Sequence, residues 1–474
     1  MSLTELEEHF KSGKRCHLIG IGGISVSALA EVLYDMGIPL TGSDVNESKI
    51  INKIRNLGID VTIGHNAENV RGAGYIIRTA AVRSDNVEIK AAMELGIPVF
   101  ERAEAWGYIM SKYKNAVCIA GVHGKTSTTS MLTHVLLEAE LDPTIMIGGN
   151  LPVLGSGYRV GKGNVIALES CEYYNSFHKF CPTIAAVLNV DADHLDFFQD
   201  IDDLIHSFRK FASLVPENGY IICNGDDVNT MEALVPLERE LFTFGFGISR
   251  ASANKSGSYT NGTTPIRVRG VKVKSIGRNP SMEVLLDSEP FCKITLQVPG
   301  VHNLRNALAT TAIAIAMGIP SGIIEKGLYD YTGVGRRFEF KGKINGADVY
   351  DDYAHHPSEL RATLNAISTL GYERIILAFQ PHTFSRTKAL FYDFVTELSR
   401  PDYTYLAPIY SAREKDDKSI SSDVLASAVH GACCLPSMKE IADDIEAIAK
   451  PGDIILTAGA GDIYKVGNIL TGVC

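Results

Sequence analysis

The segment 121–129, Gly-Val-His-Gly-Lys-Thr-Ser-Thr-Thr, constrains the fold more than any other part of the chain. It follows the apolar run 116–120 and precedes 131–141, whose pattern favours a helix. Strand, glycine turn, Gly-Lys-Thr and helix are the layout of a phosphate-binding loop. The common loop has four residues between its glycines, whereas only Val122 and His123 intervene here. We therefore expect an α/β domain that binds a nucleoside triphosphate through a shortened loop.

Each residue type in this loop suits phosphate chemistry. Glycines let backbone N–H groups approach a polyphosphate, and the helix N-terminus adds a favourable dipole. Lys125 is expected at the β- and γ-phosphates, and the Thr126 hydroxyl is expected to ligate Mg²⁺. The alternative is a glycine-rich turn with an exposed lysine, which the agreement of strand, loop and helix signals disfavours.

Size and composition restrict the class of protein. A chain of 474 residues corresponds to about three domains, and a net charge of −10 argues against nucleic acid or an anionic membrane as the main partner. The acidic start is unlike a signal peptide, and no apolar run is long enough to span a membrane. Nine scattered cysteines without a Cys-x-x-Cys pair indicate a reducing cytoplasm and argue against structural zinc.

The first segment opens with a strand, a glycine turn, a helix and a second strand, expected at 15–19, 20–23, 24–36 and 38–42. This order is typical of the first half of a dinucleotide-binding fold, in which an acidic residue, here Asp44, follows the second strand. Ser25 occupies the position of the third glycine in that fingerprint. A nicotinamide cofactor is therefore one option, and any nucleotide diphosphate is another.

Two apolar runs downstream of the phosphate loop end in polar clusters: 165–168 before Glu169, and 185–190 before Asp191, Asp193 and His194. At the carboxyl ends of parallel strands these side chains would face the loop. Mg²⁺ prefers oxygen ligands, so Glu169 and Thr126 suit it, with His194 as a partner for a second ion. The alternative is a helix N-cap cluster at Asp193 with an uninvolved histidine.

The remaining chain changes texture twice. A Ser/Asn/Gly/Thr-rich stretch at 249–264 precedes alternating runs at 266–269 and 271–274, which predict antiparallel strands on one edge, before a helix at 302–316. From about 333 the βα alternation returns, with strands expected at 375–379, 403–407 and 453–457 and a helix after the glycine turn 459–462.

Three polar clusters in this last part are candidates for substrate contacts. The run 351–357, Asp-Asp-Tyr-Ala-His-His-Pro, could hold zinc but lacks a third soft ligand, so a loop that orients a charged substrate or an ATP phosphate is favoured. Arg386 follows a strand and suits anion recognition, against the alternative of a solvated loop. The pair Arg336-Arg337 suits a phosphate from a neighbouring domain, against a surface pair.

Taken together, these motifs closely resemble those of the Mur ligases, ATP-dependent amide-forming enzymes of bacterial peptidoglycan synthesis. The resemblance is collinear over nearly the whole chain and comprises 20–23, 121–126, 188–196, 302–306, 335–339, 351–357, 380–387, 410–414 and 459–463. The phosphate loop marks the superfamily. Gly-Ile-Gly-Gly, the paired histidines and the segment Ala412-Arg413-Glu414 indicate the branch that adds L-alanine.

The resemblance implies an α/β protein of three domains: a Rossmann-like domain at 1–113 for a UDP sugar, a central P-loop ATPase-type domain with an antiparallel edge at 114–331, and a Rossmann-like ligase domain at 332–474 that closes over the site. It implies joining of L-alanine to the lactyl carboxylate of UDP-N-acetylmuramate through an acyl phosphate. The alternatives are attachment of a preformed peptide to the same sugar, and a nucleotide-binding module without catalysis, which Lys125 and Glu169 disfavour.

The resemblance also assigns site residues. The UDP-sugar contacts would be Gly20, Ile21, Gly22, Gly23, Ser43 and Asp44. The ATP contacts would be Gly121, His123, Gly124, Lys125, Thr126, Ser127, Asn303, Asn306, Arg336 and Asp351. Two Mg²⁺ ions would lie near Thr126, Glu169 and His194, and the catalytic groups would be Lys125, His194, Arg336, His356 and Arg386.

The sequence departs from the family pattern at two places. Thr383 stands where relatives often carry arginine, which puts an alanine-side contact in doubt. Sister ligases use a carbamylated lysine near the position of Arg209 and Lys210, and the resemblance to the alanine-adding branch does not imply one here. The partners are expected to be small molecules, without nucleic acid or stable membrane association, and the chain is expected to be a monomer or homodimer in the cytoplasm.

Overall fold

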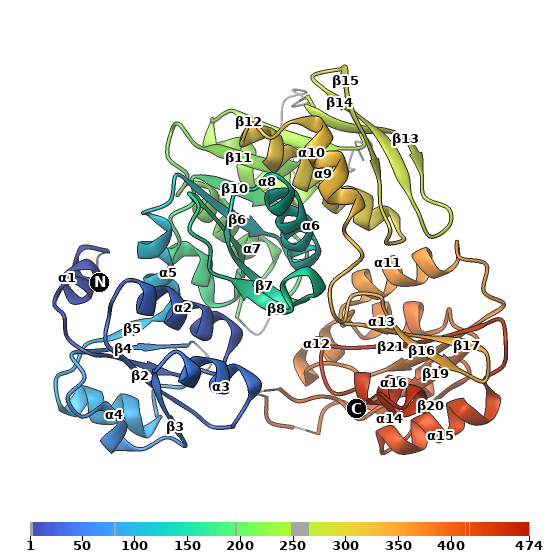
Figure 1. The fold of residues 1–474 in the computed structure, drawn as a ribbon. Helices are drawn as coiled ribbons and strands as arrows, with labels where there is room; N and C mark the ends of the chain where they lie inside the picture. Colours follow the sequence, from blue (N-terminus) through green and yellow to red (C-terminus); the bar gives the residue numbers. More distant parts are fainter. Residues whose placement is uncertain are drawn as a thin grey trace.

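The computed structural model describes residues 3–79, 82–194, 197–247, 265–412, 414–416 and 418–473. The Ser/Asn/Gly/Thr-rich stretch 249–264 and three residues of the family motifs, Leu195, Asp196 and Arg413, lie outside these ranges. The described chain forms three sheets, each in its own α/β unit (Figure 1). The predicted α/β class is thereby confirmed.

The first sheet is entirely parallel, with strand order β3-β2-β1-β4-β5. Its strands are β1 Cys16–Ile19, β2 Leu40–Asp44, β3 Asp60–Ile63, β4 Tyr75–Arg78 and β5 Val99–Glu101. Its helices are α1 Leu3–Lys11, α2 Ile24–Asp35, α3 Lys49–Asn56, α4 Val87–Glu94 and α5 Arg102–Met110. The second strand begins two residues later than predicted, since Pro39 cannot donate to the ladder and only its carbonyl pairs, with the Cys16 N–H.

The central sheet has ten strands in the order β15-β14-β13-β12-β11-β10-β6-β9-β7-β8. The strands are β6 Asn115–Ala120, β7 Thr144–Leu151, β8 Ser156–Arg159, β9 Val165–Ser170, β10 Ile184–Val187, β11 Tyr220–Asn224, β12 Leu241–Gly245, β13 Val268–Lys274, β14 Ser281–Leu286 and β15 Glu289–Thr295. The antiparallel edge is confirmed at β13–β15, but the two predicted runs form the single strand β13. An antiparallel pair at the opposite edge, β7 with β8, was not predicted.

Helices cover both faces of the central sheet. They are α6 Lys125–Glu138, α7 Ile201–Ala212, α8 Val228–Leu234, α9 Val301–Ala316 and α10 Ser321–Tyr329. The apolar side chains of α6 and α9 share one hydrophobic core with the sheet. A second core joins α5 of the first unit to α7 of the central one, with Trp106 and Phe208 fully buried in it. The first and central units are therefore packed together rather than merely tethered.

The third sheet has the order β16-β17-β21-β18-β19-β20 and is parallel except for β16, which runs against β17. Its strands are β16 Glu339–Ile344, β17 Ala347–Asp352, β18 Arg374–Phe379, β19 Tyr403–Leu406, β20 Ala432–Cys434 and β21 Asp453–Ala458. Its helices are α11 Pro357–Ile367, α12 Phe384–Ala389, α13 Phe391–Leu398, α14 Ser422–Ala428, α15 Met438–Ile448 and α16 Tyr464–Thr471. In Figure 1 the central unit lies above the other two. None of the described helices combines the length and apolarity that a membrane crossing requires.

Candidate active site

The phosphate loop joins β6 to α6, as predicted from the sequence. Gly124 is the N-cap of α6 in the left-handed region, with φ 86°. A Cβ atom there would lie 2.6 Å from Oδ1 of Asn306, so only glycine fits the turn. The neighbouring strand fixes the loop further, because Asn189 accepts the His123 N–H at 2.8 Å and donates to the His123 carbonyl oxygen at 2.8 Å.

Lys125 forms a buried ion pair with Glu172. Its Nζ lies 3.0 and 3.3 Å from the two carboxylate oxygens, and it also donates to the carbonyl oxygens of Gly121 and Val122. Burial alone would lower the pKa of Lys125, but Glu172, Cys171 and Glu169 together outweigh burial and raise the pKa. Glu172 is only 1% exposed, and although burial opposes ionisation, Lys125 holds its pKa below the ordinary value. The lysine is therefore charged and lies at the loop where a phosphate would bind.

The predicted metal ligands occupy two neighbouring positions around this ion pair. Thr126 Oγ1 donates to Glu169 Oε2 at 3.2 Å, and Glu169 Oε1 accepts the Gly148 N–H at 2.6 Å. His194 Nε2 lies 3.5 Å from Glu172 Oε1, and its ring stacks on Tyr173 at 4.4 Å. Burial raises the pKa of Glu169. The hydroxyl and carboxylate oxygens of Thr126 and Glu169 are the hard donors that Mg²⁺ prefers.

The alternative prediction for Asp193, a helix N-cap, depends on Leu195 and Asp196, which lie outside the described residues. No described helix begins at Asp193, and α7 begins at Ile201 with Asp200 as its N-cap. The Asp193 carboxylate instead accepts the His194 N–H at 2.8 Å and two N–H groups of Arg386, at 2.8 and 3.0 Å. Burial opposes its ionisation, yet Arg386 together with three neighbouring histidines lowers the pKa of Asp193 below the ordinary range.

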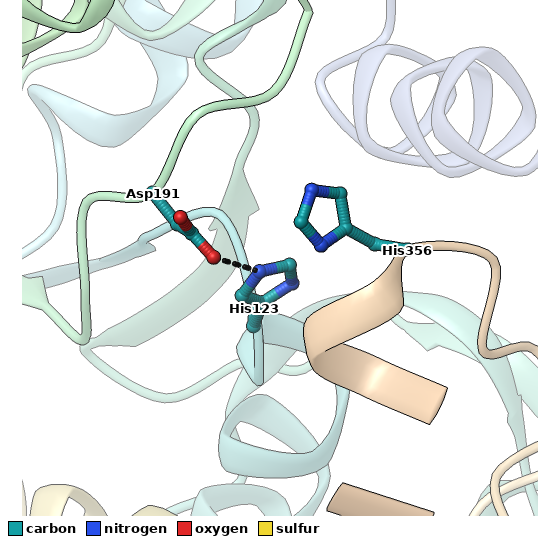
Figure 2. Close-up of side chains that lie close together, drawn as sticks. All are labelled: His123, Asp191 and His356. Carbon is teal, nitrogen blue, oxygen red and sulfur yellow. Dashed lines mark hydrogen bonds and ion pairs between the residues drawn. The ribbon is translucent and has the colours of Figure 1, made fainter. Parts of the chain in front are cut away.

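His123 contacts both the central and the third unit. Its Nε2 lies 3.1 Å from Asp191 Oδ2, and its Nδ1 lies 3.5 Å from Glu359 Oε1. Burial would lower the pKa of His123, but these two carboxylates outweigh burial and raise it to about 9. Figure 2 shows His356, at the start of α11, beside this pair. The imidazole of His123 is therefore bound by carboxylates. Within the phosphate loop, its backbone N–H and carbonyl groups, rather than its side chain, bind Asn189 and shape the loop.

A cavity of about 650 Å³ adjoins the loop on the α9 side. Its lining includes five of the ten predicted ATP contacts, namely His123, Gly124, Ser127, Asn303 and Asn306. Arg337 and Asp352 of the third unit complete it. Burial raises the pKa of Asp352 to about 6. A nucleotide-sized space thus lies between the central and the third unit, directly beside the phosphate loop.

Arg336 and Asp351, two predicted ATP contacts, are not among the residues that line this cavity. Arg336 Nε donates to Asp351 Oδ2 at 3.0 Å, and its other N–H group donates to the Gly459 carbonyl oxygen at 2.7 Å. Asp351 is 1% exposed, because it also accepts the Thr457 hydroxyl inside the sheet. The next residue of each pair, Arg337 and Asp352, lines the cavity instead. The left-handed backbone of Arg336, with φ 59°, turns the chain at this point.

The third unit contacts three consecutive residues of the central unit, Asp191, Ala192 and Asp193. Ser358 Oγ donates to Asp191 at 2.9 Å, and His356 Nε2 lies 3.2 Å from the Ala192 carbonyl oxygen. Arg386 binds Asp193, as described above. His356 and Arg386, which were predicted to be catalytic, therefore contact residues of the central unit. These contacts join the third unit to the central unit next to His194.

Beside these contacts lies a cavity of about 520 Å³, lined by Tyr173, His194, Thr383 and Arg386 among others. Thr383 is the N-cap of α12, with φ 68°, and its hydroxyl accepts the Arg386 N–H at 3.4 Å. Glu414 closes the same helix start, accepting the N–H groups of Phe384 and Ser385. Thr383 thus lines a cavity next to His194, the candidate metal ligand.

The glycine turn of the first unit opens on a separate cavity of about 970 Å³. Gly20, Gly22, Gly23 and Asp44 line it, and Asp44 accepts the Gly22 N–H at 2.8 Å. Ile21 and Ser43 are not among the residues that line it, since Ile21 packs in the core and the Ser43 hydroxyl donates to buried Glu88 at 2.7 Å. Their contacts with the UDP sugar stay a prediction. Glu169 and Cys171 of the central unit border the same cavity.

The sequence did not identify Glu172 and Glu359 as site residues, and it indicated Arg337 only as part of the pair with Arg336. Glu172 had a signal, since it lies in the polar cluster that follows β9. Arg337 stands next to the residue that was chosen. Glu359 lies inside α11, and nothing in the local pattern distinguished it from a surface carboxylate. Its pKa is held well below the ordinary value because His355, His123 and Arg337 outweigh its burial.

The fold and site define a three-unit α/β protein in which a phosphate loop lies between two cavities of nucleotide size. Three family models match consecutive parts of the chain: "Mur ligase family, catalytic domain" at 15–114, "Mur ligase middle domain" at 119–314, and "Mur ligase, glutamate ligase domain" at 336–461. The chain belongs to the Mur ligase family, as the sequence predicted.

Curated relatives resemble it over nearly their full length. The UDP-N-acetylmuramate–L-alanine ligase of Acetivibrio thermocellus is 44% identical over 96% of this chain and 95% of its own. That of Clostridium novyi is 41% identical over 99% of both chains. The solved UDP-N-acetylmuramate-alanine ligase MurC of Thermotoga maritima is 26% identical, with a TM-score of 0.77 over 97% of this chain and 98% of its own.

Proposed function

We propose that this protein joins L-alanine to the lactyl carboxylate of UDP-N-acetylmuramate, with ATP converted to ADP and phosphate, in the synthesis of peptidoglycan precursors. The observation that carries the proposal is the near-full-length similarity to enzymes with that name. The geometry supports it, because Glu169 borders the cavity at the glycine turn and also contacts the phosphate loop through Thr126. One carboxylate substrate and one triphosphate would thus meet at the same point.

The chemistry requires an activated acid. A carboxylate has a poor leaving group, whereas an acyl phosphate releases phosphate readily. The substrate carboxylate attacks the γ-phosphoryl group of ATP, the bond to ADP breaks, and an acyl phosphate forms. The alanine amine then attacks the carbonyl carbon, loses a proton, and phosphate departs. Lys125 and Arg337 offer positive charge to the transferring group. Closure of the third unit excludes water that would hydrolyse the intermediate.

Magnesium fits the oxygen donors of the central unit. Thr126 and Glu169 would hold one ion and His194 would face a second, with ATP phosphates as the other ligands. When bound, the ions offset negative charge on the phosphates. A Glu169→Gln variant should weaken Mg²⁺ binding, measured by Mn²⁺ titration followed by electron paramagnetic resonance. The control Glu138→Gln, at a half-buried ion-pair partner of Lys326, should bind Mn²⁺ as the native protein does.

We also propose functional units at 1–113 for the UDP sugar, 114–331 for ATP and 332–474 for closure and the amino acid. A cytoplasmic location is supported by eight free cysteines in the described chain, five of which are buried or half-buried in the first and central units: Cys16, Cys118, Cys181, Cys223 and Cys292. Free thiols are typical of a reducing compartment.

A coupled ADP-release assay with an amino-acid panel tests the reaction. We expect release only when UDP-N-acetylmuramate and L-alanine are both present, with the coupled product identified by mass spectrometry. Equal phosphate release without any amino acid would contradict the proposal. A preference for a preformed tripeptide over L-alanine in direct competition would favour the peptide-ligase alternative.

A further inference from the structure

Arg102 is a half-buried cation with no hydrogen bond or ion pair to another residue in the described chain. It is the first residue of α5 and lines the cavity of about 970 Å³ at the glycine turn. Its Nε atom is shielded from solvent and has no hydrogen-bond partner, and none of the described carboxylates forms an ion pair with it. The neighbouring carboxylate of Glu101 belongs to the capping box at the start of α5.

The position of α5 places this guanidinium at the glycine turn. Trp106 lies four residues along, on the same face of the helix as Arg102. Its Nε1–H reaches Ser25 at the start of α2, with 3.1 Å to Oγ and 3.3 Å to the carbonyl oxygen. The start of α2 is the end of the turn that contains Gly22 and Gly23. Arg102 therefore lies between this turn and the central unit, whose Cys171 borders the same cavity.

An unpaired guanidinium in this place is unfavourable for the protein alone. Removing a charge from water costs free energy unless an opposite charge and hydrogen bonds replace the water. Burial lowers the pKa of Arg102, which expresses the same cost. A guanidinium offers parallel N–H donors that match a phosphate or a carboxylate. The cavity thus holds a donor set for an anion that no described side chain supplies.

We propose that Arg102 binds an anionic oxygen of the UDP-sugar substrate, supplied by its diphosphate or its lactyl carboxylate. This inference rests on the proposed function, because that function supplies a substrate with both groups. The diphosphate would meet Arg102 at the glycine turn. The carboxylate would meet it on the side of the cavity that Glu169 and Cys171 form, where the acid must lie to reach the γ-phosphate.

Two substitutions test the role of the charge in the full chain. Arg102→Met removes the charge and keeps an apolar stem, and Arg102→Lys keeps the charge without the planar donors. Isothermal titration calorimetry would measure the Kd of UMP, UDP, UDP-N-acetylglucosamine and UDP-N-acetylmuramate. The matched control is Arg71→Met, since Arg71 is exposed in the same unit and pairs only with Glu68 on the surface.

We expect Arg102→Met to bind UDP-N-acetylmuramate about 10- to 100-fold more weakly, the loss expected for one hydrogen-bonded charge contact. The Arg102→Lys variant should lose less affinity for UDP-N-acetylmuramate, and the Arg71→Met variant should keep the native affinity. A loss that begins with UDP identifies the diphosphate, and a loss seen only with UDP-N-acetylmuramate identifies the carboxylate. Equal affinities of Arg102→Met and the native protein for all four ligands would overturn the inference.

Thermal unfolding without ligand separates binding from a structural role. Because the guanidinium has no partner, Arg102→Met should have a Tm equal to or higher than that of the native protein. A lower Tm together with unchanged affinities would show that Arg102 only supports the fold, and would overturn the inference. If the native protein itself failed to bind UDP-N-acetylmuramate, the proposed function would fail and this inference with it. Native binding with an unaffected variant refutes the Arg102 role alone.

Discussion

Lys125 Nζ lies 3.0 Å from Glu172 Oε2, and this ion pair lies directly under the phosphate loop. The two charges neutralise each other in a place from which water is largely excluded. A nucleotide phosphate would compete with Glu172 for the same ammonium group. Binding of nucleotide is therefore expected to replace one buried anion by another, rather than to add charge to an empty site.

Glu172→Gln should make the stability of the protein depend on nucleotide. Without the carboxylate, Lys125 keeps a buried charge that is uncompensated, so the free energy of unfolding should fall by about 3 kcal/mol. ADP and Mg²⁺ should raise the Tm of this variant more than that of the native protein, since phosphate supplies the missing charge. Differential scanning fluorimetry measures both shifts. Equal ADP-induced shifts in the two proteins would contradict this account, and Glu138→Gln, which breaks an ion pair with Lys326, serves as the control.

Lys125→Ala should reduce turnover at least about 100-fold, the cost of losing one preorganised donor to the transferring group. The coupled ADP-release assay measures it at saturating ATP and UDP-N-acetylmuramate. Lys162, an exposed lysine of the same unit, is the control, and Lys162→Ala should keep native activity. Activity retained by Lys125→Ala would refute its role at the phosphates.

The His123 contacts should make stability fall in alkaline solution. The pKa of His123 is raised to about 9 in the folded chain, above the ordinary value of roughly 6.5. Its contribution is thus complete below about pH 6.5 and is lost as the pH rises through 9, a loss of roughly 3 kcal/mol at most. Urea unfolding at pH 6.5, 8 and 9.5 tests this. His123→Gln should flatten the decrease, whereas His206→Gln, at an exposed position, should not.

Arg386 and Asp193 should act as one unit in catalysis. Arg386→Gln and Asp193→Asn should each lower kcat, because either change loosens the contact between the third unit and the residue before His194. The double variant should be less impaired than the sum, with a coupling energy of about 1–3 kcal/mol in a double-mutant cycle. Additive effects would argue for separate roles.

The pair Arg374–Asp453 provides a matched control for that cycle. It is another arginine–carboxylate pair, with N–H groups 2.6 and 2.8 Å from the two oxygens, and both residues lie within the third unit. Its disruption should lower the Tm. The kcat of the protein that remains folded should stay close to the native value.

Local patterns predicted the elements of this fold well. The apolar run before Gly121, the glycine turns and the alternation at β13 each depend on neighbours in sequence, and the structure contains all three features. The edge pair of β7 and β8 escaped prediction, because its strands lack a regular alternation and pair through a register shift between Met146 and Leu151. The strand at Leu40 was predicted too early, because Pro39 was counted as part of it.

The sequence predicted which residues belong to the site better than it predicted which of their side chains face the cavity. The loop residues, Glu169, His194 and the two asparagines of α9 were found because each follows a strand or forms part of a motif. Arg336 and Arg337 are adjacent, and only the left-handed turn at Arg336 decides which of them faces the cavity. The contact of Arg386 with Asp193 joins residues far apart in sequence and depends on how the third unit lies against the central one.

Three site residues have left-handed backbone conformations, which residues other than glycine rarely adopt: His194 with φ 54°, Arg336 with φ 59° and Thr383 with φ 68°. Each costs of order 1 kcal/mol or more and would be relieved by glycine. Directed evolution that selects for thermal stability alone should therefore enrich glycine at these positions and yield thermostable but inactive proteins. Stabilising substitutions for this enzyme should therefore be sought at other positions, with these three residues left unchanged.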